Sequence, residues 1–254
     1  MRVFAGPNGS GKSTIINSVR KYEVNGIPID FGIYINADLI HQGLLKRPLD
    51  FKNYTLEITE EDFLAIAMVS GLINESFTEN DFKDTYEFKG NSVKLKNQNF
   101  GDRLAQIIAD FLRKKLLQEK KKFSFETVFS HPSKIEIMKE AAKQGYKVYL
   151  YFVSTEDPEI NKYRVKDVRV KEGGHDVPED KIVSRYYRSL ELMYDAAQVC
   201  YQAYFFDNSE EGKDSRQVAH FKVIGGKKSW DEFDQELKVP NWFIKYYSEK
   251  VQKV

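Results

Sequence analysis

The sequence predicts an α/β fold of three layers, with helices on both faces of a mainly parallel sheet. Short apolar segments rich in β-branched and aromatic residues alternate with segments of helical periodicity. This alternation is typical of parallel strands joined by helices, and a glycine-rich loop separates the first strand from the first helix. The alternation stops between about residues 43 and 100, which predicts a helical and hairpin insert within a single domain spanning 1–254.

The predicted elements of the first half begin with an apolar run at residues 1–5, a buried strand that leads into the loop. Residues 14–20 continue as a helix, and residues 33–36 form a second short strand. Inside the insert, a helix is expected over 60–75. The Lys-Gly-Asn sequence at 89–91 is typical of a hairpin turn.

The predicted elements of the second half begin with residues 104–117, where apolar side chains recur every three or four positions and predict a helix with one buried face. A third strand is expected at 123–128, followed by a helix from about residue 134 that Gly145 ends. The apolar run 146–153 is the strongest strand signal in the chain. Further elements are a long helix at 177–198, strands at 203–206 and 218–224, and a terminal helix after Pro240.

The composition is that of a globular protein, with 41% hydrophobic and 30% charged residues. The 39 basic residues balance 38 acidic ones to a net charge of +1, which argues against nucleic acid or an anionic membrane as the main partner. The single cysteine, Cys200, rules out an internal disulfide. No apolar run approaches the roughly 18 residues that span a bilayer, so a cytoplasmic location is expected.

The loop near the N-terminus fits the phosphate-binding pattern G-x-x-x-x-G-K-[ST]. Its glycines let the backbone wrap tightly so that N–H groups point at phosphate oxygens, and the next helix adds its positive dipole end. Lys12 is expected to reach the β- and γ-phosphates of ATP, and the Ser13 hydroxyl to bind Mg²⁺. The predicted nucleotide-binding residues are Gly6, Pro7, Asn8, Gly9, Ser10, Gly11, Lys12, Ser13 and Thr14.

Polar side chains follow two predicted strands, and ligands gather at such strand ends in open parallel sheets. Asp38 is a candidate base that takes a proton from a substrate hydroxyl; the alternative is an N-cap for the segment 39–45. Glu126 and Thr127 close the third strand. If that strand lies beside the first, Glu126 is near the metal and the γ-phosphate, where it orders a water or holds a substrate hydroxyl. The alternative is an ordinary polar strand end.

Four arginines flank a Gly-Gly turn and predict a lid over about 160–190. They are Arg164, Arg169, Arg185 and Arg188. Guanidinium groups offer planar donors to the oxygens of a phosphoryl group in transfer. For any single arginine the alternative is a solvated basic helix face, but at least two of the four are expected to act on phosphate.

With these motifs in this order, the sequence resembles the zeta-toxin family of P-loop kinases, in the branch often described as predicted ABC-type ATPases. The loop is common to many ATPases, whereas the later blocks are more specific. They are Asn36-Ala37-Asp38, Phe125-Glu126-Thr127-Val128, Ser130-His131-Pro132-Ser133, the segments 164–169, 173–178 and 185–189, and Asp207-Asn208-Ser209.

The resemblance implies a P-loop kinase fold and roles for several residues. Asp38 would serve as the base, and Glu126 and Thr127 would contact the substrate. Arg169 and Arg185 would stabilise the transferring phosphate, with Arg164 and Arg188 as the alternative pair.

The predicted function is ATP-dependent phosphoryl transfer to a hydroxyl of a small molecule. The resemblance implies UDP-N-acetylglucosamine as a candidate acceptor and an antitoxin protein as a candidate partner. The segment 43–100 matches nothing in the family, so the acceptor stays open. Two alternatives also stay open: a polynucleotide 5′-hydroxyl kinase, which needs a basic acceptor channel, and a nucleotide-dependent switch with weak ATPase activity that uses the insert as its binding surface.

Overall fold

The structure is a computed structural model of the chain, and it describes residues 1–169, 177–232 and 238–252. The chain divides into two compact units. Unit 1 comprises Met1–Phe31 and Glu126–Val254, and unit 2 comprises Gly32–Phe125. Unit 2 therefore contains the whole predicted insert together with the strand and helix on either side of it.

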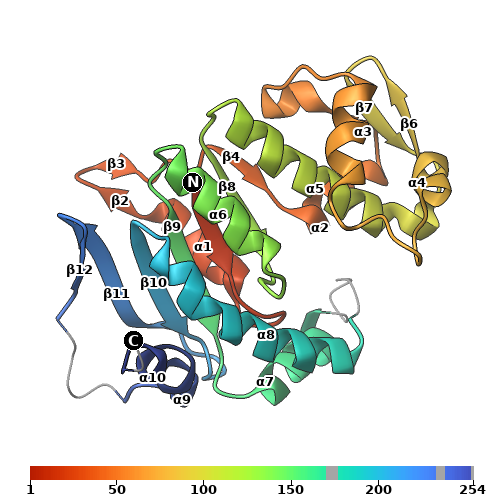
Figure 1. The fold of residues 1–254 in the computed structure, drawn as a ribbon. Helices are drawn as coiled ribbons and strands as arrows, with labels where there is room; N and C mark the ends of the chain where they lie inside the picture. Colours follow the sequence, from red (N-terminus) through yellow and green to blue (C-terminus); the bar gives the residue numbers. More distant parts are fainter. Residues whose placement is uncertain (170–176, 233–237, 253–254) are drawn as a thin grey trace. The chain divides into compact units, whose positions relative to one another are not determined.

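In the described part of unit 1, the main sheet runs in the order β12-β11-β10-β9-β1 (Figure 1). β1, β9 and β10 pair in parallel, whereas β11 and β12 add an antiparallel edge. The bounds are Arg2–Ala5 for β1, Tyr149–Ser154 for β9, Gln202–Asp207 for β10, Arg216–Ile224 for β11 and Lys227–Trp230 for β12. The strands predicted at 1–5, 146–153 and 203–206 are thus confirmed, and their parallel pairing confirms the predicted fold class.

The helices of unit 1 include α1, which begins directly after the glycine-rich loop, and α8, the predicted long helix, whose buried residues run from Ile182 to Ala197. A short hairpin of β2 (Glu23–Val24) and β3 (Ile27–Pro28) follows α1. The helical bounds are Lys12–Lys21 for α1, Ser133–Lys143 for α6, Pro158–Tyr163 for α7, Arg164–Arg169 for η3, Glu179–Gln198 for α8, Asn241–Phe243 for α9, Ile244–Ser248 for η4 and Glu249–Gln252 for α10.

The core of unit 1 is aromatic on the sheet face that the C-terminal helices cover. Phe205 packs against Phe243 and Tyr247 with ring centroids 5.0 and 5.1 Å apart, and Phe152 lies 6.2 Å from Trp242. Because buried aromatic rings of this size remove large apolar areas from water, these contacts fix the terminal segment predicted after Pro240 onto β9 and β10. β9 in turn pairs with β1, the strand that leads into the glycine-rich loop.

Unit 2 pairs the predicted strand at 33–36 in parallel with the predicted strand at 123–128. A second sheet, in the order β5-β7-β6, is antiparallel. The strand bounds are Ile33–Ile35 for β4, Leu49–Asp50 for β5, Tyr86–Lys89 for β6, Ser92–Leu95 for β7 and Phe123–Thr127 for β8, whose last two residues belong to unit 1. The helical bounds are Ala37–Leu44 for α2, Phe51–Tyr54 for η1, Glu60–Met68 for α3, Glu79–Thr85 for α4, Gln98–Phe100 for η2 and Gly101–Gln118 for α5.

A cluster of aromatic rings forms the core of unit 2. Phe63 is fully buried and lies 5.3 Å from Phe111 and 5.5 Å from Tyr86 between ring centroids. The predicted hairpin is confirmed, with Gly90 at φ +62°. The predicted helix at 60–75 is shorter, because it ends at Met68 and Gly71 takes φ +71°, a left-handed conformation that stops a helix.

Candidate active site

The glycine-rich loop leaves β1 and enters α1 with its three glycines at positive φ: +144° at Gly6, +74° at Gly9 and +92° at Gly11. Side chains are rarely tolerated in these conformations, and space is also lacking. A Cβ atom on Gly9 would lie 2.7 Å from the carbonyl oxygen of Asn161, and one on Gly6 would overlap the carbonyl oxygen of Val153. The loop is therefore a tight cradle that only glycine can form at these positions.

Lys12 is the first residue of α1, and its side chain is buried at 8% exposure. Its Nζ donates to the carbonyl oxygens of Gly6 at 3.1 Å and Pro7 at 2.9 Å. It also lies 3.9 Å from the Glu126 carboxylate. The structure thus brings Glu126, the predicted strand-end carboxylate, next to the predicted phosphate-binding lysine.

The residues expected to hold ATP and Mg²⁺ fit those groups. Ser13 and Thr14 are exposed in the first turn of α1, where the helix dipole favours anions. The Ser10 hydroxyl is fully buried within the loop and has no hydrogen-bond partner in the described part of the chain, so a phosphate oxygen would give it one. Mg²⁺ in such sites takes most of its ligands from water and phosphate, so one serine hydroxyl is an adequate protein ligand.

The arginines of the predicted lid occupy two elements of unit 1. Arg164 begins η3, and its guanidinium donates to the backbone carbonyls of Asn208 at 2.7 Å and Glu210 at 3.5 Å. Arg169 ends η3, but its side chain lies outside the described residues, as do residues 170–176 with the Gly-Gly turn.

Arg185 and Arg188 lie close together on α8. Burial, and then the charge of Arg188, lower the pKa of the Arg185 guanidinium from its ordinary value. Arg188 donates to the Ser184 carbonyl at 3.3 Å. No carboxylate pairs with either arginine among the described residues. Two adjacent guanidinium groups attract anions, and a phosphoryl group carries the matching charge.

Asp38 belongs to unit 2, in the first turn of α2. The N-cap of this helix is Asn36, whose side chain accepts from the Leu39 amide at 3.0 Å. The alternative in which Asp38 caps the helix is therefore wrong, because Asn36 already does so.

Thr127 ends β8, and its hydroxyl accepts from the Phe129 amide at 3.1 Å. This bond holds the backbone of the following turn, where Phe129 takes φ +61°. A hydroxyl keeps its own proton to donate while it accepts such a bond, so Thr127 retains a donor for a substrate atom.

Two asparagines that contact the loop were missed as site residues by sequence reasoning. Asn161 in α7 donates to the Asn8 carbonyl at 2.5 Å, and Asn208 after β10 donates to the Ser10 carbonyl at 2.9 Å. Asn208 belongs to an Asp-Asn-Ser block at a strand end, which was a usable signal. Asn161 stands in a short helix without any distinctive motif.

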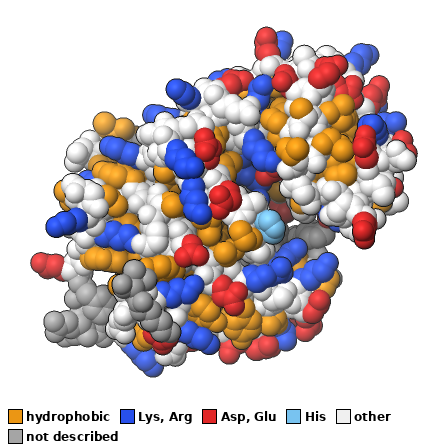
Figure 2. Space-filling view, viewed as in Figure 1, with side chains coloured by type: hydrophobic (Ala, Val, Ile, Leu, Met, Phe, Trp, Pro, Cys, Tyr) orange, Lys and Arg blue, Asp and Glu red, His pale blue; other side chains and the backbone are white. Residues whose placement is uncertain are grey.

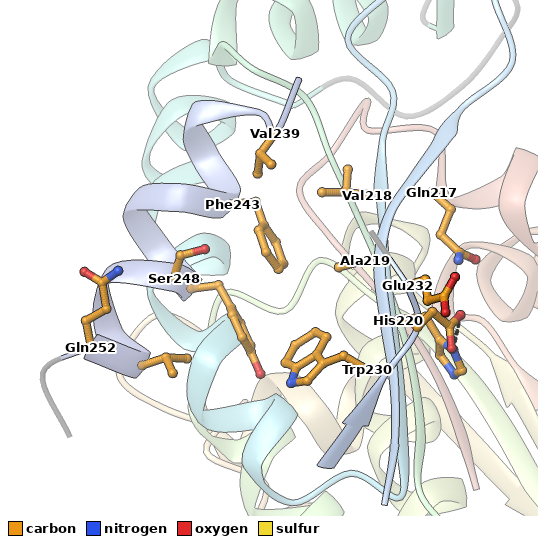
Figure 3. A pocket seen from close by; sticks show the side chains of 13 residues that line it. Gln217, Val218, Ala219, His220, Trp230, Glu232, Val239, Phe243, Ser248 and Gln252 are labelled. Carbon is orange, nitrogen blue, oxygen red and sulfur yellow. Dashed lines mark hydrogen bonds and ion pairs between the residues drawn. The ribbon is translucent and has the colours of Figure 1, made fainter. Parts of the chain in front are cut away.

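A separate groove of about 560 Å³ lies between β11 and the C-terminal helices of unit 1 (Figure 3). Val218, Trp230 and Phe243 point into it in this view. Its described lining includes none of the predicted site residues, so the phosphate loop and this groove are different features of unit 1.

The surface carries both signs of charge. Figure 2 shows acidic and basic side chains interspersed over the visible face, in keeping with the net charge of +1. Of the helices that the structure describes, none combines the length and apolar character needed to cross a bilayer.

Comparison with known proteins links this chain to both solved structures and a curated sequence. No family model matches it. A 64-residue stretch, 25% of this chain, is 41% identical to an uncharacterized protein of Haemophilus influenzae (strain ATCC 51907 / DSM 11121 / KW20 / Rd) and covers 45% of it. A chain of the AvrRxo1-ORF1:-ORF2 complex crystallised with ATP is 16% identical, with a TM-score of 0.53 over 91% of this chain.

The AvrRxo1-ORF1:AvrRxo1-ORF2 complex with sulphate ions gives the same TM-score, 0.53, at 15% identity. This chain spans 60% of the length of the matched chain in both complexes. At such identities the similarity extends to the fold. The chain therefore shares an α/β fold, with its mainly parallel sheet, with a component of a two-protein complex that has been crystallised with ATP.

Proposed function

We propose that this chain is an ATP-dependent phosphotransferase that acts on a hydroxyl group of a small molecule, with Mg²⁺ as cofactor. The glycine loop of unit 1 carries the proposal. It combines three glycines that no other residue can replace, a buried lysine and a buried serine hydroxyl that has no hydrogen-bond partner among the described residues. Such a loop is typical of sites that cradle the phosphates of a nucleotide. The AvrRxo1-ORF1:-ORF2 complex with ATP supports the choice of nucleotide, because it shares the fold.

In this proposal the acceptor hydroxyl oxygen attacks the γ-phosphorus of ATP, the bond to the β,γ-bridging oxygen breaks, and ADP leaves. Asp38 takes the proton of the acceptor hydroxyl, as the zeta-toxin resemblance implies. Lys12 and the arginines among Arg164, Arg169, Arg185 and Arg188 neutralise charge on the phosphates. Ser13 would hold Mg²⁺, which would further neutralise the phosphate oxygens when bound.

The acceptor class follows from the resemblance and from the charge balance. A UDP-sugar such as UDP-N-acetylglucosamine is the first candidate, with Glu126 and Thr127 as its contacts and the segment 43–100 as part of its wall. A protein partner of the antitoxin type is proposed on the same resemblance. The AvrRxo1 neighbours add support, since they are complexes of two different chains.

The test is a transfer assay with γ-labelled ATP and purified protein against UDP-sugars, nucleosides and 5′-hydroxyl oligonucleotides. The expected product is a labelled UDP-sugar. Labelled oligonucleotide would identify a polynucleotide kinase instead. Slow release of labelled phosphate with no labelled acceptor would favour a nucleotide-dependent switch, and no binding of ATP at all would refute the proposal.

A further inference from the structure

We propose that Asn161 and Asn208 are positioning residues that orient the amide groups of the phosphate loop. Each donates a hydrogen bond to one backbone carbonyl of the loop and keeps that carbonyl pointing away from the phosphate site. The N–H group of the following residue then points toward the phosphates. The proposal rests on the proposed function, because it assumes that this loop receives the phosphates of a nucleotide. It adds to that function two residues outside the loop that act only through the loop backbone.

The two contacts are made from two different elements of unit 1. Asn161 is fully buried in α7, and its Nδ2 donates to the Asn8 carbonyl at 2.5 Å. Asn208 follows β10, and its Nδ2 donates to the Ser10 carbonyl at 2.9 Å. The carbonyls held belong to alternate residues of the loop. The two hydrogen bonds therefore fix two peptide planes of the loop, the one that follows Asn8 and the one that follows Ser10.

The geometry of the peptide bond turns these contacts into control of the amides. The described residues contain no cis peptide bond, and in a trans peptide the carbonyl and the N–H that it adjoins point in opposite directions. Holding the Asn8 carbonyl outward therefore directs the Gly9 N–H inward, and holding the Ser10 carbonyl does the same for Gly11. Within the described chain no hydrogen bond engages either amide, so both are available to phosphate oxygens.

Hydrogen bonds to neighbouring residues also hold the two asparagines in place. The Asn161 carboxamide oxygen accepts from the Thr155 hydroxyl, and the Thr155 carbonyl accepts from the buried Tyr186 hydroxyl at 2.7 Å. Burial raises the pKa of Tyr186, which keeps this hydroxyl a donor. Asn208 is fixed through its backbone, because its amide donates to Ser154 at 2.8 Å and its carbonyl accepts from Arg164 at 2.7 Å.

The same asparagines give a second reason for two of the loop glycines. A Cβ atom on Gly9 would lie 2.7 Å from the Asn161 carbonyl oxygen, and one on Gly11 would overlap the Asn208 carboxamide nitrogen. Gly9 thus leaves room for the Asn161 backbone, and Gly11 leaves room for the Asn208 carboxamide. Glycine at these positions serves the approach of the asparagines as well as the tight turn.

The experiment compares Asn161→Leu, Asn208→Leu and the double variant with wild type. Leucine has a similar size, carries no charge toward a phosphate and cannot donate. Calorimetry with inorganic tripolyphosphate and with ATP should show a three- to tenfold loss of affinity for each single variant, equal for the two ligands, as expected for one lost hydrogen bond. Asn241→Leu is the matched control, since the Asn241 amide donates to Glu156 and not to the loop.

A spectroscopic measurement separates positioning from general destabilisation. In protein labelled with ¹⁵N-glycine, the Gly9 and Gly11 amides should move downfield when tripolyphosphate binds to wild type. In Asn161→Leu the Gly9 shift should shrink, and in Asn208→Leu the Gly11 shift should shrink, at a temperature where unliganded protein is fully folded by circular dichroism. Asn208 is partly exposed, so its variant remains informative if the buried Asn161→Leu fails to fold.

Two outcomes overturn the proposal, and they are distinct. If wild type binds neither tripolyphosphate nor ATP, the proposed function fails and the positioning role fails with it. If wild type binds both, while the folded variants bind within twofold of wild type and show unchanged glycine shifts, the positioning role alone is refuted.

Discussion

Lys12 Nζ lies 3.9 Å from the Glu126 carboxylate oxygen, and the lysine donates at the same time to two carbonyls of its own loop. A buried ammonium group needs such partners, since an unpaired charge is costly away from water. The phosphates of ATP would replace carbonyl oxygens by charged ones, which make stronger hydrogen bonds. These contacts therefore keep the Lys12 ammonium group at the loop and out of solvent.

The first prediction concerns this lysine. Mg²⁺–ATP at 100 times its Kd should stabilise wild type by about 2.7 kcal/mol through binding linkage. For a chain of this size that is a rise in Tm of about 5–10 °C. Lys12→Ala should reduce the rise to a small fraction of this value, measured by thermal unfolding with and without ligand. Lys21→Ala, at the exposed end of the same helix, should keep the full rise. Equal shifts in Lys12→Ala and wild type would refute the role.

The second prediction concerns the paired arginines of α8. Arg185→Ala should lower phosphoryl transfer by roughly a thousandfold while ATP affinity changes little, because the charge that it meets develops in the transition state. Arg185→Lys should not restore the rate, because an ammonium group lacks the planar pair of donors. Single-turnover rates and calorimetric Kd values measure the two effects separately. Near-normal turnover in alanine variants of all four lid arginines would remove the lid from the mechanism.

The third prediction uses the same pair without nucleotide. Arg188→Gln removes the like charge that lowers the pKa of Arg185. Like charges one turn apart on a helix destabilise by about 0.2–0.5 kcal/mol, so the free energy of unfolding should rise by that amount while transfer falls. Urea unfolding of the unliganded variant tests this. A decrease in stability would mean that Arg188 has a structural role that outweighs the repulsion.

The fourth prediction tests Asp38, in the first turn of α2, as the base. Asp38→Asn should leave ATP affinity and Tm near normal and lower transfer by roughly a hundredfold to ten-thousandfold, the range for loss of a general base. Asn36→Ala is the control, because it removes the observed cap and should cost about 1 kcal/mol of stability. Preserved transfer in Asp38→Asn would exclude Asp38 as the base.

The fifth prediction concerns unit 2. Phe63 contacts five aromatic rings of this unit, so Phe63→Ala should cost about 3–5 kcal/mol. Below the lowered Tm, ATP affinity should remain unchanged, because the phosphate loop belongs to unit 1. The KM for the acceptor should rise if the segment 43–100 forms part of the acceptor site. An unchanged acceptor KM in the destabilised variant would argue against that role.

Much of the fold could be predicted because its signals are local. The strands at 1–5 and 146–153 and the helix at 104–117 are continuous apolar runs or regular periodicities, and burial of one face suffices to define them. The ends of elements were predicted less well. The helix expected over 60–75 ends at Met68, shortly before Gly71 at positive φ. The cap of α2 is Asn36 rather than Asp38, because both are polar residues near the helix start that can serve as a cap.

The sequence by itself determined the glycine-rich loop, since the spacing of Gly6, Gly11, Lys12 and Ser13 serves a backbone conformation that few other structures need. Only the tertiary structure decided what holds that loop. Asn161 and Asn208 reach carbonyls that lie 153 and 198 positions away in the chain. No periodicity or local spacing encodes such a pairing, because it depends on how the parallel strands bring their ends together.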